Sequence, residues 1–283
     1  MRSVKSLIAA GAASLLSSAA FAADMPIMPP PPMAYAPPPV QQDFGGWYLR
    51  GDIGMTNTQG RLHVNAYDTL PAGATINHLG HSFDSGMVYG LGVGYQFNNW
   101  FRADITGEYR SKVSFNGTDF ATFPTNPLAD AYHGGYQAWV GLVNVYADLG
   151  TWWCLTPFIG AGVGAASIKT TAFSDVATFP SGSGLTGTFV ADGATKTNLA
   201  WAVHAGVAYK VTNNFTVELA YRYLDMGTAK HGNGRSFDGT NTGPSSFEFR
   251  DLTSQDVKLG VRFALPCCDV PPPPPPPPLI RKG

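Results

Sequence analysis

Apolar and polar residues alternate along most of the region between Phe44 and Leu265. The stretch FRADITGEYR, residues 101–110, shows the pattern clearly. Its odd positions are Phe, Ala, Ile, Gly and Tyr, and its even positions are Arg, Asp, Thr, Glu and Arg. Because successive side chains of a strand point to opposite faces, this segment predicts a strand with one apolar and one charged face.

Eight segments carry this alternation, and the connections between them are short and long in turn. The predicted strands are roughly 46–56, 86–97, 101–110, 136–149, 156–168, 199–211, 215–226 and 249–265. Connections near Asn98, Trp152 and Asn213 are tight turns, whereas 57–85, 111–135, 169–198 and 227–248 are long and polar. Long loops on one side and short turns on the other are typical of outer-membrane barrels, and a compact soluble domain rarely carries four such loops.

The distribution of glycine and aromatic residues separates a membrane barrel from a secreted lipocalin-like barrel, whose apolar face would line a cavity. Gly90, Gly92 and Gly94 share the charged face, which suits a crowded interior. Aromatic residues such as Phe101 and Tyr109 lie at the ends of the apolar faces, which suits two lipid–water interfaces. The sequence therefore predicts an all-β fold, an eight-stranded antiparallel up-and-down transmembrane β-barrel with four long extracellular loops and short periplasmic turns.

The amino-acid composition identifies the segments that precede and follow the predicted barrel. Residues 1–22 combine a basic start, a short apolar run and an Ala-Phe-Ala site, which predicts a cleaved signal peptide. Residues 23–43 are rich in proline, and 266–283 contain a Cys-Cys pair and eight consecutive prolines, so both predict extended tails. The barrel occupies 44–265, and no other apolar run reaches the length of a transmembrane helix. The net charge of −1, without a basic patch, argues against a nucleic-acid partner.

Charged residues recur at the inward-facing positions of the predicted strands. An eight-stranded barrel is only wide enough for its own side chains, and isolated charges there are costly to desolvate. We therefore expect an interior ion-pair network that plugs the barrel, with Glu218 supporting Arg222 or a neighbouring cation. The network is predicted to comprise Arg50, Asp52, Arg102, Asp104, Glu108, Arg110, Glu218, Arg222, Lys258 and Arg262.

Three stretches resemble a known family. They are GGWYLRGDIG, TPFIGAGVGAA and NLAWAVHAGVAYKVTNNFTVELAYRYLDMG. Together they are similar to the small outer-membrane β-barrel proteins of alphaproteobacteria, within the wider opacity-protein and OmpA-type group, and the likeness covers 44–265. It implies a Gram-negative outer-membrane location and roles in envelope integrity, adhesion or host contact. This chain departs from the family in continuing for twenty residues beyond Phe263.

The sequence predicts neither a catalytic site nor a cofactor. Nothing in it brings a histidine, a serine and a carboxylate together near the bilayer surface, as a lipid hydrolase requires. His78 and His81, with Asp84 nearby, are ligand types that zinc accepts, but a solvated pair of loop histidines is commoner. We therefore expect no enzyme and no metal site.

The three cysteines allow a disulfide. Cys154 lies in a predicted periplasmic turn, and Cys267 and Cys268 follow the last strand on the same side. The compartment is oxidising, so Cys154 could bridge to one of the pair. The distance across the barrel is the obstacle, because bridged Cα atoms lie within about 7 Å of each other.

Two functional classes remain open. The first is a structural or surface-binding, adhesin-like protein, and the alternative is a narrow porin or channel for small solutes. An even number of strands places both termini in the periplasm. The expected partners are outer-membrane lipids and lipopolysaccharide, peptidoglycan or a periplasmic protein through the proline tails, and a host or cell-surface ligand through the loops. We also expect the long loops to be dispensable for folding.

Overall fold

The computed structural model describes residues 45–64, 72–122, 127–178, 186–237, 242–244 and 247–265. All of them belong to the second of two compact units, Asp43–Gly283. The predicted signal peptide and both proline-rich tails lie outside the described residues. Within the described part of the chain, no helix has the length and apolar character needed to cross a membrane.

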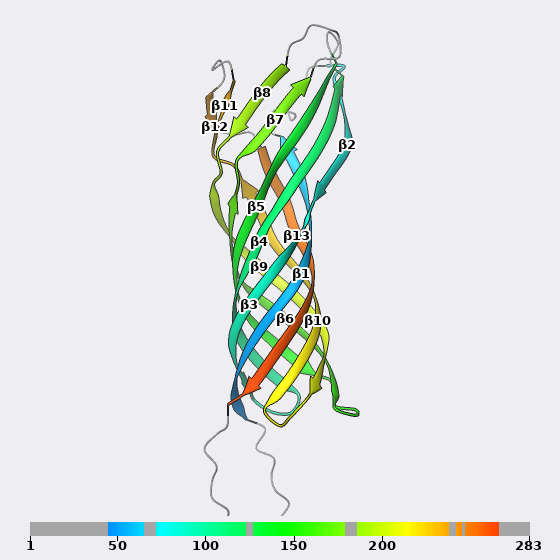
Figure 1. The fold of residues 1–283 in the computed structure, drawn as a ribbon, viewed down its shortest axis with the longest axis vertical. Helices are drawn as coiled ribbons and strands as arrows, with labels where there is room; N and C mark the ends of the chain where they lie inside the picture. Colours follow the sequence, from blue (N-terminus) through cyan, green and yellow to red (C-terminus); the bar gives the residue numbers. More distant parts are fainter. Residues whose placement is uncertain are drawn as a thin grey trace, which may run out of the picture. The chain divides into compact units, whose positions relative to one another are not determined.

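Eight antiparallel strands close into a ring, because the last strand pairs with the first (Figure 1). In order around the ring they are β1 (Gly46–Val64), β3 (Ser85–Gln96), β4 (Phe101–Thr122), β5 (Leu128–Asp148), β6 (Leu155–Thr170), β9 (Thr195–Lys210), β10 (Phe215–Lys230) and β13 (Phe247–Ala264). Short turns join β3 to β4, β5 to β6 and β9 to β10 at one end, called the turn end here. The opposite end is the loop end. The predicted eight-stranded up-and-down barrel is confirmed.

Among the described residues, five shorter strands lie at the loop end (Figure 1). One of them, β2 (Thr75–Phe83), pairs with β4 beyond the point where β3 begins. The others extend a sheet outward from β5 in the order β7 (Phe173–Thr178), β8 (Thr186–Ala191), β11 (Asn233–Ser236) and β12 (Thr242–Pro244). The four long connections thus lie at one end as predicted, but strands occupy much of their length.

The barrel strands also run further into these connections than the alternation indicated. Strand β4 has 22 residues, about twice the length that a membrane-crossing strand needs. A bulge explains the early predicted end, because the register with β5 shifts between Arg110 and Val113. The extra residue reverses which positions face inward, so the period-two pattern breaks at Ser111 and Lys112. The Ser111 hydroxyl accepts a hydrogen bond from the backbone N–H of Met87 at this point.

The outer surface carries an apolar band between two aromatic belts. Near the turn end Tyr95 contacts both Trp47 and Phe97 edge to face. About eight residues along the strands, Tyr89, Tyr109 and Trp139 form a cross-strand row. At the usual strand rise and tilt these belts are roughly 20 Å apart, close to the apolar band of outer-membrane barrels. The apolar face is therefore the lipid-facing face, as predicted.

Beyond the second belt the apolar side chains turn inward. Phe249 is fully buried there, and its ring contacts those of Phe83, Phe115 and Phe173. This group, called the aromatic core here, comprises buried Leu62, Val64, Val113, Phe115, Tyr132, Tyr136, Phe173, Leu224, Met226, Phe247, Phe249 and Leu252, with partly buried Phe83 packed against them. The loop end therefore has the interior of a water-soluble domain.

Glycines on the inner face make room for large side chains, as the crowded-interior interpretation requires. A Cβ on Gly94 would lie 2.3 Å from the Tyr48 ring, and one on Gly160 would lie 2.4 Å from the Tyr146 ring. Both tyrosine rings lie close to these glycines and fill the barrel near the turn end. An alanine at either position would force the ring to move.

Candidate functional site

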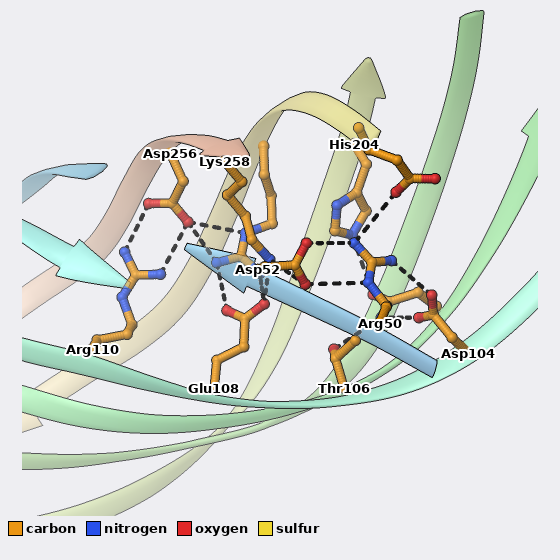
Figure 2. A network of polar contacts seen from close by, with 12 residues as sticks. Arg50, Asp52, Asp104, Thr106, Glu108, Arg110, His204, Asp256 and Lys258 are labelled. Carbon is orange, nitrogen blue, oxygen red and sulfur yellow. Dashed lines mark hydrogen bonds and ion pairs between the residues drawn. The ribbon is translucent and has the colours of Figure 1, made fainter. Parts of the chain in front are cut away.

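Inside the barrel, between the two aromatic belts, the charged side chains form a continuous ion-pair network. Figure 2 shows its central part. Asp256 on β13 is its most connected carboxylate. Arg110 donates to it from both Nη atoms, at 3.0 and 2.8 Å, and Arg222 donates from Nε and Nη2, at 2.9 and 2.6 Å. All three side chains are buried, and the two arginines share this one carboxylate as an ion-pair partner.

Glu108 connects this group to the next one. Its Oε1 accepts hydrogen bonds from Arg222 at 2.8 Å and from Lys258 at 2.6 Å. The Lys258 ammonium also lies 3.5 Å from Asp52. Glu108 therefore has two cationic partners on two other strands of the barrel, β10 and β13.

Arg50 connects the centre of the network to the turn end. It donates to Asp52 at 2.9 Å, to Asp104 at 2.7 Å and to the Tyr146 hydroxyl at 2.8 Å. Asp104 also accepts a hydrogen bond from Asn144 at 2.8 Å. This arrangement holds the guanidinium plane between two carboxylates, a geometry for which arginine is well suited.

The last group of charges lies beside a cavity at the turn end. Glu218 has one carboxylate oxygen 3.4 Å from both Arg102 and Arg262, and its other oxygen lies 3.7 Å from Arg50. The Arg102 guanidinium also stacks over the Tyr146 ring, 4.2 Å from its centre. A cavity of about 390 Å³ lies at this end and is lined by Arg262 among others.

All ten predicted network residues therefore face the interior and lie in this network, and of the two alternatives predicted for Glu218 the structure shows the neighbouring cations. Arg222 pairs with Glu108 and Asp256 rather than with Glu218. Glu218 instead serves the neighbouring cations Arg50, Arg102 and Arg262. Glu218 and Arg222 share a strand and a face, yet the partners of each come from other strands.

Sequence reasoning missed two carboxylates that complete the network, Asp256 and Asp148. Asp148 accepts a hydrogen bond from Arg102 at 3.2 Å. Both lie at inward-facing positions inside the predicted strands 136–149 and 249–265, so applying the alternation to every position of those strands would have identified them. With them, the six predicted cations face six carboxylates among the described residues, and the formal charge of the network is zero.

A second polar cluster lies at the loop end, outside the membrane band. His78 Nδ1 and His81 Nε2, both on β2, lie 2.8 Å from the same Oδ1 atom of Asp119 on β4. Burial acts to raise the pKa of Asp119, but hydrogen bonds from His81 and His78 outweigh it and lower that pKa. Asp84, the predicted neighbour of these histidines, is exposed and lies outside the cluster.

Asp175 on β7 lies close to the same acidic region. Burial raises the pKa of its carboxyl to about 7, and the charges of Asp130 and Asp119 add to the rise. Asp130 and Asp119 are direct cross-strand neighbours on β5 and β4. Negative charge therefore accumulates beside the two histidines.

The remaining predicted features concern the cysteines and the other histidines. Cys154 is exposed in the turn between β5 and β6 and forms no disulfide with a described residue. Cys267 and Cys268 lie outside the described residues, so the bridge stays a prediction. The hydrogen bonds of His133, His204 and His231 end on Asn116, Asn144 and the Phe247 carbonyl, and not on a serine hydroxyl.

Comparison with known proteins identifies the family. Residues 8–263 match the model of the outer membrane protein beta-barrel domain. An uncharacterized protein of Brucella suis is 34% identical over 223 residues, which are 73% of this chain and 76% of that protein. A protein of Rickettsia felis named "Putative adhesin" is 27% identical over 266 residues, 91% of this chain and 97% of its own.

Among solved structures, the outer membrane protein OprG from Pseudomonas aeruginosa matches with a TM-score of 0.45. The two sequences are 15% identical, and the match covers 78% of this chain and 97% of that chain. Together, the barrel, its lipid-facing belts and the family match establish where the protein resides. The chain belongs to the outer membrane protein beta-barrel family and is an integral outer-membrane protein in contact with lipid.

Proposed function

We propose that this protein is a non-catalytic surface-binding protein of the outer membrane, which presents its loop end to a ligand outside the cell. The observation that carries the proposal is the aromatic core. Strands that continue beyond the lipid-facing band pack around buried Phe115, Phe173 and Phe249, so the loop end is a folded platform. A rigid platform loses less conformational entropy on binding than mobile loops do.

The filled interior favours this function over the alternative of a porin. Arg102, Arg110 and Arg222 are among the largest fully buried side chains, and they occupy the level of the lipid-facing band. The aromatic core fills the barrel above them. Side chains at both levels therefore stand in the path that a solute would take, although a narrow channel remains the second candidate to be tested.

The relative named "Putative adhesin" covers nearly the whole chain and supports the same class of function. In this proposal the turn end and both termini face the periplasm, and lipopolysaccharide surrounds the barrel on the outer side. The proline tails would then act as spacers toward peptidoglycan, since eight prolines span roughly 25 Å. Recovery of peptidoglycan with the full chain, but not with a chain truncated after Leu265, tests this assignment.

Adhesion of intact cells tests the surface-binding function. Bacteria that express the protein should attach to a layer of epithelial cells better than bacteria that carry an empty vector. The double substitution Arg235→Ala and Phe237→Ala should reduce attachment, because both side chains are exposed at the loop end. Asn213→Ala, in a turn at the opposite end, is the matched control and should leave attachment unchanged.

Conductance of the refolded protein in a planar lipid bilayer separates the two candidate functions. The proposed function predicts no stable large current, because the interior network blocks the barrel. A steady current of porin size, together with attachment no better than that of the vector control, would replace the proposal with a channel function.

A further inference from the structure

We propose that His78, His81 and Asp119 form a binding site for a divalent transition-metal ion of the zinc class at the loop end of the barrel. One potential ligand atom from each residue lies within 4.8 Å of the other two. The two ring nitrogens are each 2.8 Å from the same carboxylate oxygen. Two imidazoles and one carboxylate are a ligand set that zinc accepts.

A backbone irregularity is what brings the two histidines together. His78 and His81 are three residues apart, and in a regular strand their side chains would point to opposite faces. The register of β2 against β4 shifts between His78 and Gly80, so that Leu79 is an extra residue. This bulge places both rings on the face that carries Asp119. Bulges often reorient a side chain beside a functional site.

A glycine on the neighbouring strand β4 leaves space for the imidazole ring of His81. His81 pairs across the sheet with Gly117, and a Cβ at that glycine would lie 2.9 Å from the His81 ring. Gly117 therefore positions His81, since any larger residue would push the imidazole away from Asp119. The side chain of His81 is 17% exposed and that of His78 is 61% exposed, so the site is reachable from solvent. Of the expected solvated loop pair, His78 is exposed and His81 is half-buried, and both lie on strand β2 in contact with Asp119.

The burial of the Asp119 side chain, together with its unpaired oxygen, indicates that a ligand binds here. Its side chain is 1% exposed, and its Oδ2 atom has no hydrogen-bond partner among the described residues. Leaving a buried carboxylate oxygen unpaired is costly. Asp130 lies directly opposite on β5, and like charges in that position destabilise a sheet. A bound divalent cation would offset both costs.

The three ligand atoms lie within 4.8 Å of one another, so the two ring nitrogens would have to move closer together to hold a metal. Zinc binds imidazole nitrogen and carboxylate oxygen at about 2.0–2.2 Å, so tetrahedral ligands lie roughly 3.3 Å apart. The nitrogen–oxygen distances of 2.8 Å must then lengthen by about half an ångström. A cavity of about 570 Å³ is lined by His81, Asn116 and His133, and it provides room for water or another ligand at the open coordination position.

Metal binding would replace the two ring contacts at the Asp119 oxygen by contacts to one cation. Without metal, His78 Nδ1 and His81 Nε2 both contact this oxygen at 2.8 Å. With metal, these nitrogens supply lone pairs, and the proton of each neutral ring lies on its other nitrogen. The consequence is structural, because the ion would fasten β2, which lies outside the closed ring, to the barrel strand β4.

The test measures cobalt and zinc binding to the full-length protein refolded in detergent. Co²⁺ is the probe, because its visible absorption bands report the coordination geometry. We expect one Co²⁺ per chain, displaced by Zn²⁺. His78→Ala and Asp119→Asn should each weaken binding at least about 100-fold, more than the loss of an outer-shell partner costs. Asp84→Asn, at an exposed loop-end carboxylate outside the cluster, is the matched control, and binding should not change.

A second measurement keeps the test decisive if a variant folds poorly. His78→Gln changes an exposed side chain on a strand outside the ring, so the barrel should form and show its usual heat-modifiable migration. Zinc should slow hydrogen exchange of the β2 amides in the wild type and not in His78→Gln. Wild-type protein that binds no Co²⁺, or a His78→Gln variant that binds it equally well, would overturn the proposal.

Discussion

The same barrel wall encloses two different interiors. Between the aromatic belts, buried arginines and carboxylates fill the space, and Asp256 alone accepts four hydrogen bonds from Arg110 and Arg222. At the loop end, rings such as Phe249 and Phe115 fill it. Lipid removes any benefit of burying apolar groups inside the membrane band, because apolar side chains are equally well placed facing outward. Where water surrounds the wall, the hydrophobic effect places them inside again.

The first prediction breaks the charged region at its most connected point. Asp256→Ala leaves Arg110 and Arg222 without their shared carboxylate, and should lower the free energy of unfolding by about 4 kcal/mol. Urea unfolding of the refolded protein in lipid measures this loss. Asp84→Ala, at an exposed loop-end position, is the control and should cost less than about 0.5 kcal/mol. Equal stability of both variants would show that buried water replaces the carboxylate.

The second prediction breaks the aromatic core. Phe249→Ala removes a fully buried ring and should cost about 3 kcal/mol of loop-end stability. Limited proteolysis should then cut the loop end while heat-modifiable migration of the barrel persists. Phe237→Ala, at a side chain that is 92% exposed, should change neither property. Loss of the whole barrel in Phe249→Ala would mean that the two interiors fold as one unit, and that the long connections are not dispensable.

The third prediction uses pH to distinguish the loop end. Burial in the aromatic core lowers the pKa of His231 from 6.5 to about 4. The unfolded state therefore binds more protons between these values, and stability is lost as pH falls through this window. The loss should reach about 2 kcal/mol between pH 7 and pH 5. Hydrogen exchange of the loop end, compared between the wild type and His231→Phe, measures this loss of stability. A difference between the two proteins that does not vary with pH would contradict the prediction.

The smallest effect is expected at an ion pair outside both interiors. Arg61 and Asp251 form a salt bridge on the outer surface of the loop end, with side chains 81% and 61% exposed. Water screens such a pair, so Arg61→Ala should cost less than about 0.5 kcal/mol in the same urea experiment. A loss comparable to that of Asp256→Ala would show that burial does not separate strong from weak ion pairs in this protein.

Local sequence was sufficient to predict the barrel. Alternation identified eight strands and the lipid-facing side, and parity identified ten inward charges from Arg50 to Arg262. The pattern failed where the register shifts, at Ser111 and Lys112 on β4 and at Leu79 on β2. Beyond those points apolar residues face inward, so the strands no longer follow the membrane pattern.

Tertiary structure alone decided which charges meet. Parity depends only on neighbours along one strand, so it assigned Glu218 and Arg222 to the same face. Their partners depend on the register between strands, which the hydrogen bonds and bulges of the whole sheet set. For the same reason, the contact of His78 and His81 with Asp119, about forty residues away, was decided by the pairing of β2 with β4. No pattern along a single strand contains that information.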